Sequence, residues 1–364
     1  MRSADGDGDV ADVLPGAVFW EPVVSSWLGP DLLAESVPVD GGSVSWSANR
    51  EVPGGLDLGV PRVRHGRSWV PGIDDRHPLA RFGQVLHVSV RVTALVSARS
   101  WLYRLGTFLV TDWQLDAGAV RVTGESMTRK VVDARLRTPT ATRAGGTLTS
   151  ELKRLVTPYM GLIVDPALTN RAVPKMAWGE SRIDAVREIV AAWPARARED
   201  AFGNLRILPP LPDVPVPLAT LTDGADGTVV SAYQSDTRDG TFNVVVARGQ
   251  QEDDQGRPAF QQVAQVTTGP LAVGTYGEVT TFLSTPLLNS LAACSAAART
   301  HLANVTRPAR TIPVTLAPDP RWEVDDAVAI RADDALHWGF VSGVQIPLTS
   351  ADGDQRMDVE VPGA

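Results

Sequence analysis

The side chains that could carry catalytic chemistry are few in this sequence and widely separated along it. No two histidines stand at the i, i+4 spacing with which one face of a helix binds a metal ion. No G-x-S-x-G elbow of a serine hydrolase occurs either. A Ser–His–Asp triad assembled only in space stays open, but we expect no catalytic residue and no enzymatic activity. The histidines are His65, His77, His87, His301 and His337.

An acidic segment at the N-terminus resembles a calcium-binding loop in one respect. Asp5, Asp7 and Asp9 alternate with glycine, as oxygen ligands do in such a loop. The twelfth position counted from Asp5 is Gly16, whereas an EF-hand needs a bidentate glutamate there. We therefore interpret residues 1–12 as a flexible acidic tail and expect no metal site.

Two pairs of adjacent carboxylates could suggest acid–base chemistry on glycans. They are Asp325-Asp326 and Asp333-Asp334. Neighbouring residues on a strand point to opposite faces, so such pairs are poor catalytic partners. We interpret both pairs as solvated turns.

Three other features each have a functional and a structural interpretation. Residues 143–147 precede an expected helix but lack the G-K-[ST] of a phosphate-binding loop, which favours a loop with a helix cap. The basic stretch 129–143 could face DNA or a protein partner, but a solvated loop or salt bridges at a subunit interface are the structural alternatives. The ten tryptophans could bind sugars, but such residues more often anchor cores and subunit interfaces.

The chain has a single cysteine, Cys294, which excludes an intrachain disulfide and a cysteine-based metal site. We expect Cys294 to be packed in a helix, and we expect no cofactor.

The composition is that of an ordinary folded chain with a slight excess of acidic residues. A length of 364 residues predicts two or three domains, and 43% hydrophobic residues suffice for packed cores. The net charge of −8 argues against a dedicated nucleic-acid-binding protein. The sequence starts without the basic and apolar regions of a signal peptide, and no apolar run is long enough to span a membrane. We therefore expect a protein made in a cytosol, without a membrane anchor.

Hydrophobic periodicity predicts strands near both ends of the chain. Between residues 85 and 95, apolar side chains alternate with polar ones, which is the pattern of a half-buried strand. Two more strands, 106–111 and 119–123, are joined by a turn that contains Gly118. Further strands are expected at 43–47, 205–208, 242–246, 328–330, 338–344 and 357–361.

The middle of the chain changes to helical spacing. Apolar residues there recur every three or four positions, and polar residues suited to helix capping precede each run. The five prolines between residues 209 and 217 exclude regular helix and central strand, so this segment is an extended connector. The three helices are expected at 148–159, 183–193 and 286–304, capped by Thr147, by Ser181 with Asp184, and by Thr285.

The two β-rich regions resemble each other in the order and spacing of their elements. Each has an apolar strand, a strand that begins with glycine and contains an aromatic residue, a glycine turn and an alternating strand. Either the region is duplicated, or the similarity is that of hairpins in general. A trimer of a duplicated chain would present six similar units around its axis. The segments compared are 85–88, 106–110 and 120–122 with 327–330, 338–342 and 357–361.

The order of elements resembles the hub proteins of long-tailed phage baseplates, also called tail-associated or minor tail proteins. The first segment that carries the resemblance is a G-x-F-x-V strand, residues 104–111, with the strand end at 125–131. The second is the helix at 181–189 with a D-x-x-G hairpin at 200–205. The third is the Ala-rich third helix followed by residues 318–326.

The resemblance covers most of residues 80–362. It implies an α+β, predominantly β fold, in which two β-barrel-like domains flank helix-containing domains. It also implies a non-catalytic homotrimer that forms a hub ring at the virion tail tip, after assembly in the host cytoplasm. The expected partners are a distal tail protein, the tape-measure protein, and tip or fibre proteins. DNA would contact the hub only transiently in the lumen.

Domain boundaries follow from these elements, and two alternative functions stay open. One alternative is a receptor- or glycan-binding tail protein, and the other is a cell-wall-degrading tail enzyme. The expected domains are a flexible tail at 1–12, a first β-barrel domain with an N-terminal extension at 13–145, an α+β middle domain at 146–230, joining strands and a loop at 231–284, and a helix with the second β-barrel domain at 285–364.

Overall fold

The structure is a computed structural model of the 364-residue chain. The chain folds into two compact units: unit 1 comprises residues 1–233 and 313–359, and unit 2 comprises residues 234–312 and 360–364. The domain boundaries expected from the sequence remain predictions. The structure describes residues 1–6, 14, 16, 18–97, 99–116, 118–193, 195–212, 214–224, 227–232, 241–249, 254–284, 288, 290–305, 310–332 and 335–361.

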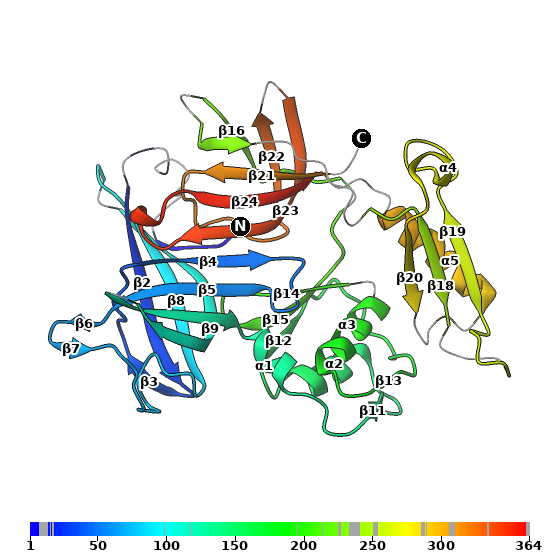
Figure 1. The fold of residues 1–364 in the computed structure, drawn as a ribbon, viewed down its shortest axis with the longest axis horizontal. Coiled ribbons are helices and arrows are strands. Elements are labelled where there is room, and N and C mark those ends of the chain that lie inside the picture. Colours follow the sequence, from blue (N-terminus) through cyan, green and yellow to red (C-terminus); the bar gives the residue numbers. More distant parts are fainter. Residues whose placement is uncertain are drawn as a thin grey trace. The chain divides into compact units, whose positions relative to one another are not determined.

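Unit 1 is built on one large, mostly antiparallel sheet, so the expected α+β, predominantly β class is confirmed. Its hydrogen-bonded path runs β17-β21-β24-β23-β4-β5-β10-β9-β8-β2-β3, with β1 on β9 and with β22 between β16 and β23 (Figure 1). The strands are β1 Asp5–Gly6, β2 Val18–Leu28, β3 Asp31–Ala34, β4 Gly41–Ser47, β5 Gly54–Pro61, β8 Gln84–Ala94, β9 Ser100–Leu115, β10 Ala119–Ser126, β16 Ala219–Thr222, β17 Val229–Ala232, β21 Arg310–Leu316, β22 Ala327–Ala332, β23 Ala335–Pro347 and β24 Gln355–Val361.

The strands of the two expected barrel regions belong to this single sheet. Strand β4 joins them, because it pairs with β5 on one side and with β23 on the other, where Gly343 lies opposite Ser47. Among the described strands no closed barrel is found. A small hairpin of β6 (Val63–Arg64) and β7 (Arg67–Ser68) and a single helical turn, η1 (Ser350–Asp352), complete the β-rich part.

The two β-rich regions share a strand order. β8, β9 and β10 are consecutive in sequence and adjacent in the sheet, with the long β9 in the middle. β22, β23 and β24 repeat this order around the long β23. Val88 lies opposite Gly106 in the first set, and Val328 lies opposite Gly339 in the second. The resemblance noted in the sequence therefore has a counterpart in pairing register.

Alternation of apolar and polar side chains explains why these segments form strands. In β8, Val88, Val90 and Val92 are fully buried, while His87 and Arg91 lie on the opposite face. This arrangement confirms the alternation predicted for residues 85–95. Inward-facing side chains from such strands form the core of unit 1.

A helix-containing region of unit 1 follows β10. Thr147 caps α2 by accepting a hydrogen bond from the backbone N–H of Ser150, and Ser181 caps α3 through the N–H of Asp184, as predicted. Its three-stranded sheet runs β12-β15-β14, with β12 and β15 parallel. The elements are α1 Thr128–Asp133, β11 Thr140–Ala141, α2 Leu148–Val156, β12 Gly161–Val164, β13 Ala177–Trp178, α3 Arg182–Ala192, β14 Arg196–Glu199 and β15 Asn204–Leu208.

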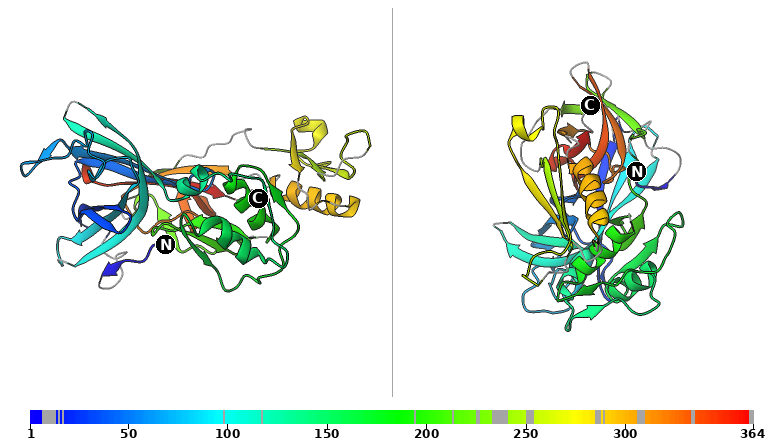
Figure 2. Two further views of the ribbon diagram at one scale, coloured as in Figure 1. Left: turned by 90° about the horizontal axis from the view of Figure 1, so that it is seen from below. Right: turned by 90° about the vertical axis from the view of Figure 1, so that its right-hand side faces the viewer.

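Unit 2 is a three-stranded sheet with one long helix on one face. The sheet runs β19-β18-β20, and α5 contacts β18 and β19 (Figure 2). Cys294 is fully buried beside Val245 and Ala298, which confirms its predicted packing role. The expected cap of this helix, Thr285, lies outside the described residues. The elements are β18 Val244–Arg248, β19 Gln261–Gln265, α4 Val273–Tyr276, β20 Thr280–Ser284 and α5 Leu291–Val305.

The N-terminal segment differs from the solvated tail that its composition suggests. β1 pairs with β9, and the side chain of Arg2 is only 5% exposed. Residues 7–12 lie outside the described residues. None of the helices in the described part of the chain has both the length and the hydropathy of a membrane-spanning segment.

Candidate functional site

The histidines and acidic side chains do not form a metal centre in the part of the chain that the structure describes, where no three His, Cys, Asp or Glu residues lie close enough to hold an ion. His77 is nearly buried, and its Nδ1 accepts a hydrogen bond from the N–H of Leu79. The ring of His87 stacks on Trp27 at 5.6 Å between centroids. Burial and the nearby Arg104 guanidinium lower the pKa of His87 to about 4. The remaining histidines lie on separate elements: His65 in the β6–β7 turn, His301 on α5 and His337 on β23.

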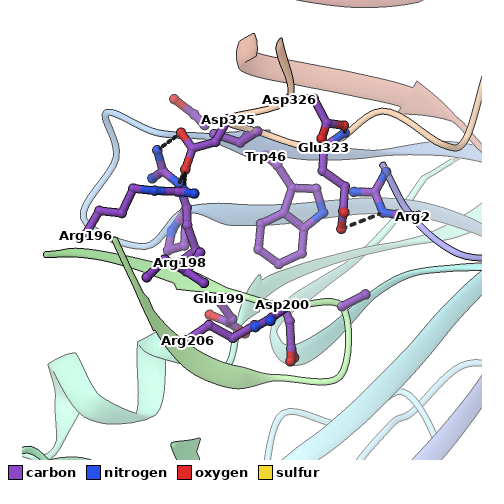
Figure 3. A pocket seen from close by; sticks show the side chains of 15 residues that line it. Arg2, Trp46, Arg196, Arg198, Glu199, Asp200, Arg206, Glu323, Asp325 and Asp326 are labelled. Atoms are coloured by element: carbon purple, nitrogen blue, oxygen red, sulfur yellow. Dashed lines mark hydrogen bonds and ion pairs between the residues drawn. The ribbon is translucent and has the colours of Figure 1, made fainter. Parts of the chain in front are cut away.

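A group of charged side chains in unit 1 lines a pocket of about 170 Å³, which we call the junction pocket (Figure 3). It lies where the β14–β15 hairpin, strand β4, the N-terminal segment and the loop before β22 meet. It therefore joins the helix-containing region to both β-rich regions. The labelled residues are Arg2, Trp46, Arg196, Arg198, Glu199, Asp200, Arg206, Glu323, Asp325 and Asp326.

Asp325 is the centre of the ionic contacts in the junction pocket. Its carboxylate accepts hydrogen bonds from Arg196 and from Arg198, whose Nε lies 2.5 Å from Oδ2. The Asp325 side chain is 8% exposed, so these pairs are largely shielded from water. Its backbone adopts φ 76°, a conformation that non-glycine residues adopt only with support from their surroundings.

The interpretation of Asp325-Asp326 as a solvated turn was wrong. Their side chains are 8% and 10% exposed, and each accepts hydrogen bonds from other parts of unit 1 or from its own loop. The two arginines of β14 explain the burial of Asp325, because a carboxylate can leave water when charged donors replace its hydration. The second pair, Asp333-Asp334, lies outside the described residues.

Arg2 provides a second contact between distant segments. Its backbone N–H donates to the carbonyl of Arg321 at 2.6 Å, and its guanidinium donates to the carbonyl oxygens of Pro320 and Trp322. Burial lowers the pKa of Arg2, while Glu323 and neighbouring aspartates oppose that shift. The N-terminal segment is thereby fixed to the loop that leads into β22.

Glu199 joins the helix-containing region to the end of β10. Its carboxylate accepts hydrogen bonds from the backbone N–H groups of Met127 and Thr128, at 2.7 and 2.9 Å, and from the Thr128 hydroxyl at 2.6 Å. These donors stand at the N-terminus of α1, where a carboxylate satisfies unpaired amides. Burial raises the pKa of Glu199, and the hydrogen bonds partly offset that rise.

The D-x-x-G hairpin between β14 and β15 docks on the outer face of β9. Asp200 Oδ1 accepts from the N–H of Phe202 at 3.0 Å and of Asn204 at 2.9 Å, which fixes the turn. The Thr107 hydroxyl donates to the carbonyl of Ala201 at 2.9 Å. Gly203 has φ +81°, and a Cβ there would lie 2.7 Å from Met127 Cγ. The hairpin motif predicted from the sequence therefore connects the helix-containing region to the first β-rich region.

The basic stretch 129–143 forms ion pairs through two of its arginines. Arg129 pairs with Glu125 at 3.1 Å and with Asp133 at 2.8 Å, and Arg135 pairs with Glu180 at 3.2 Å. These pairs lie within the chain, and Arg129 stands in α1 rather than in the loop expected there; salt bridges at a subunit interface remain a prediction. The following loop ends in the cap of α2, as predicted for residues 143–147.

The tryptophans, all of which lie in the described part of the chain, mostly serve the cores. Seven of the ten are at most 9% exposed. Trp27 and Trp113 are half-buried, and Trp338 on β23 is 50% exposed.

The junction pocket is suited to holding segments together. Arginines and carboxylates from β14, the N-terminal segment and the 319–326 loop neutralise each other within it. The prediction from the sequence missed Arg196, Arg198 and Glu199. A signal was present, because alternation along a strand places Arg196 and Arg198 on one face. The partner Asp325 is 129 residues from Arg196, and no local pattern identifies it.

Comparison with known proteins gives matches in structure alone. No family model matches the chain, and no curated protein matches it. A tail protein from Neisseria meningitidis MC58 shares 15% sequence identity, with a TM-score of 0.67 over 93% of this chain and 96% of that chain. The 43 kDa tail protein of prophage MuSo2 from Shewanella oneidensis shares 13%, with a TM-score of 0.62 over 93% and 98%.

A third similar structure is the prophage tail protein gp18 from Listeria monocytogenes EGD-e. It shares 9% sequence identity, with a TM-score of 0.56 over 93% of this chain and 94% of that chain. At these identities the similarity establishes the fold. The chain has the fold of phage tail proteins over nearly its whole length, and the resemblance inferred from the sequence is confirmed at that level.

Proposed function

We propose that this chain is a structural subunit of a phage tail tip, in which three copies form a hub ring. The ring would join the sixfold tail tube to threefold tip or fibre proteins. One observation carries the proposal: the fold agrees with that of a tail protein across 93% of this chain and 96% of that chain. Agreement over both whole chains includes the order of all the regions, which a shared single domain would not give.

The strand order supports the ring geometry. The sets β8-β9-β10 and β22-β23-β24 have the same order and the same valine–glycine pairing. Three chains with two such sets each would offer six similar units to a sixfold tube. The proposed neighbours are therefore a distal tail protein above, the tape-measure protein inside, and tip or fibre proteins below.

The buried charges support a mechanical role. Asp325, Glu199 and Arg2 each connect segments that are far apart in sequence, and each is shielded from water. Such contacts hold regions of the chain in fixed orientation, as a subunit under load in a tail requires. The proposal assigns no catalysis to the chain.

Immunogold labelling of purified tails tests the location. An antibody against an exposed segment, such as the β6–β7 hairpin, should mark the tip of the tail in electron micrographs. Labelling of fibres alone, labelling along the tube, or absence of the chain from particles by mass spectrometry would contradict a hub position.

A further inference from the structure

Three arginines stand on one wall of the junction pocket, on the hairpin of β14 and β15 (Figure 3). Arg198 of β14 lies directly opposite Arg206 of β15, so both side chains leave the same face of the hairpin. Arg196 is two residues before Arg198 on the same strand and therefore shares that face. We call these three residues the arginine wall. Like charges directly opposite each other across a strand pair are destabilising, so negative charge beside the wall relieves a repulsion.

One carboxylate of the chain pairs with the arginine wall in the part of the chain that the structure describes. Asp325 accepts hydrogen bonds from Arg196 and Arg198. Arg206 is exposed and has no hydrogen bond or ion pair with any residue that the structure describes. Burial and then the neighbouring Arg206 guanidinium lower the pKa of Arg196, while Asp165 opposes that shift. Arg206 thus adds a positive charge to the wall that no described carboxylate pairs with.

The other carboxylates that line the junction pocket already have donors of their own. Asp326 binds the N-terminal ammonium at 2.6 Å, and Glu323 lies 3.7 Å from Nε of Arg2. Glu199 accepts from the amides at the start of α1, and Asp200 accepts from the amides of the hairpin turn. Each of these four carboxylates is therefore engaged by groups other than the arginine wall.

We propose that the arginine wall binds a phosphate group inside the junction pocket. The pocket of about 170 Å³ is far larger than the roughly 15 Å³ that one water molecule requires, so a small oxyanion fits with water around it. Guanidinium groups match the geometry of phosphate and form charge-assisted hydrogen bonds with it. A phosphate has enough oxygens to accept from Arg206 and Arg196 together, while Asp325 keeps its contact with Arg198. A carboxylate offers only two oxygens, which a single guanidinium fork occupies, so phosphate is the better ligand for two arginines.

Isothermal titration calorimetry of the full chain with inorganic phosphate, at constant ionic strength in a zwitterionic buffer, tests this binding. Arg206→Gln should weaken it by about tenfold or more, because a hydrogen bond to a charged group contributes that much affinity. The control Arg64→Gln removes another exposed arginine, on β6, and should bind as the wild type does. Glycerol 3-phosphate, titrated in the same way, distinguishes a phosphate ester of a larger molecule from the free anion.

Thermal unfolding separates lost binding from lost folding. Arg206→Gln removes the repulsion with Arg198, so without phosphate it should melt at the temperature of the wild type or above it. Phosphate should raise the melting temperature of the wild type and of Arg64→Gln, because it binds the folded chain, and should leave that of Arg206→Gln nearly unchanged. Sodium chloride at the same ionic strength controls for general screening.

Equal affinity of the wild type and Arg206→Gln for phosphate, or no binding of either probe at millimolar concentrations, would overturn the inference. Acetate that binds as tightly as phosphate would overturn the assignment to phosphate. Binding of either phosphate probe that requires Arg206 supports the inference, and the tighter of the two identifies the source. Only contacts within this chain carry the proposal, so none of these outcomes alters the hub ring, whose test is the mass of the assembly.

Discussion

Asp325 combines three properties that rarely coincide in one residue. It has a positive φ, its side chain is nearly buried, and two arginines of β14 bind its carboxylate. The ion pairs and the strained backbone depend on each other, because the turn aims the carboxylate at the arginines. This position therefore fixes the orientation of the helix-containing region relative to the loop before β22.

Asp325→Asn should destabilise unit 1 strongly. The substitution removes the carboxylate charge that the partly buried Arg196 and Arg198 both contact, which costs about 3 kcal/mol of unfolding free energy. Urea denaturation measures the change. The matched control is Glu180→Gln, which removes an exposed pair with Arg135 and should change stability by less than about 0.5 kcal/mol. Equal effects of the two substitutions would contradict a structural role for Asp325.

His87 should make the stability of the chain depend on pH. Because its pKa is depressed to about 4, the unfolded state, with a pKa of about 6.5, binds the proton more tightly. The stability that neutral His87 contributes is fully present above the pKa of the unfolded state. It is lost as the pH falls toward the pKa of the folded state. From about pH 7 to about pH 5 the wild type should lose more unfolding free energy than His87→Gln. His65→Asn, on an exposed turn, should follow the wild type. If the unfolding free energies of the wild type and of His87→Gln changed identically with pH, a contribution of His87 to the pH dependence would be excluded.

At the scale of elements, the hairpin between β14 and β15 depends on close contact at Gly203. A side chain there would meet Met127 at 2.7 Å and would also be strained by φ +81°. Gly203→Ala should therefore destabilise the fold by about 2–3 kcal/mol, which combines steric overlap with the φ penalty. Gly66→Ala has the same φ problem but nothing within 4 Å of its Cβ, so it should cost only about 1 kcal/mol. Comparison of the denaturation midpoints of the two variants separates the cost of the steric contact with Met127 from the cost of the positive φ.

Elements with a clear period could be predicted from the sequence, and those that depend on distant partners could not. The alternation in β8 and the caps Thr147 and Ser181 are local signals, and the structure confirms them. β2 is different, because Pro22 interrupts its strand pattern. Pro22 lies opposite Val90 of β8, in a part of β2 that β3 does not reach, so its missing N–H is tolerated. No local sequence pattern shows that this part of β2 needs no N–H donor at Pro22.

At the scale of the whole molecule, long-range pairings decide the architecture. The sheet joins β4 to β23, whose paired residues Ser43 and Pro347 are separated by most of the chain. The parallel pairing of β18 with β20 in unit 2 likewise cannot be predicted from local periodicity. The order of elements predicted the fold class and the resemblance to tail hubs. The junction pocket could not be predicted from the sequence, because its charges come from three segments that are distant in sequence.

The mass of the assembled protein tests the central claim most directly. Native mass spectrometry should be recorded for the full chain alone and after mixing with the ring of the adjoining tail protein. A hub predicts a species of three copies, near three times 38.8 kDa, either free or added to that ring. A single copy under both conditions, or a closed assembly with a number of copies that is not a multiple of three, would contradict the hub.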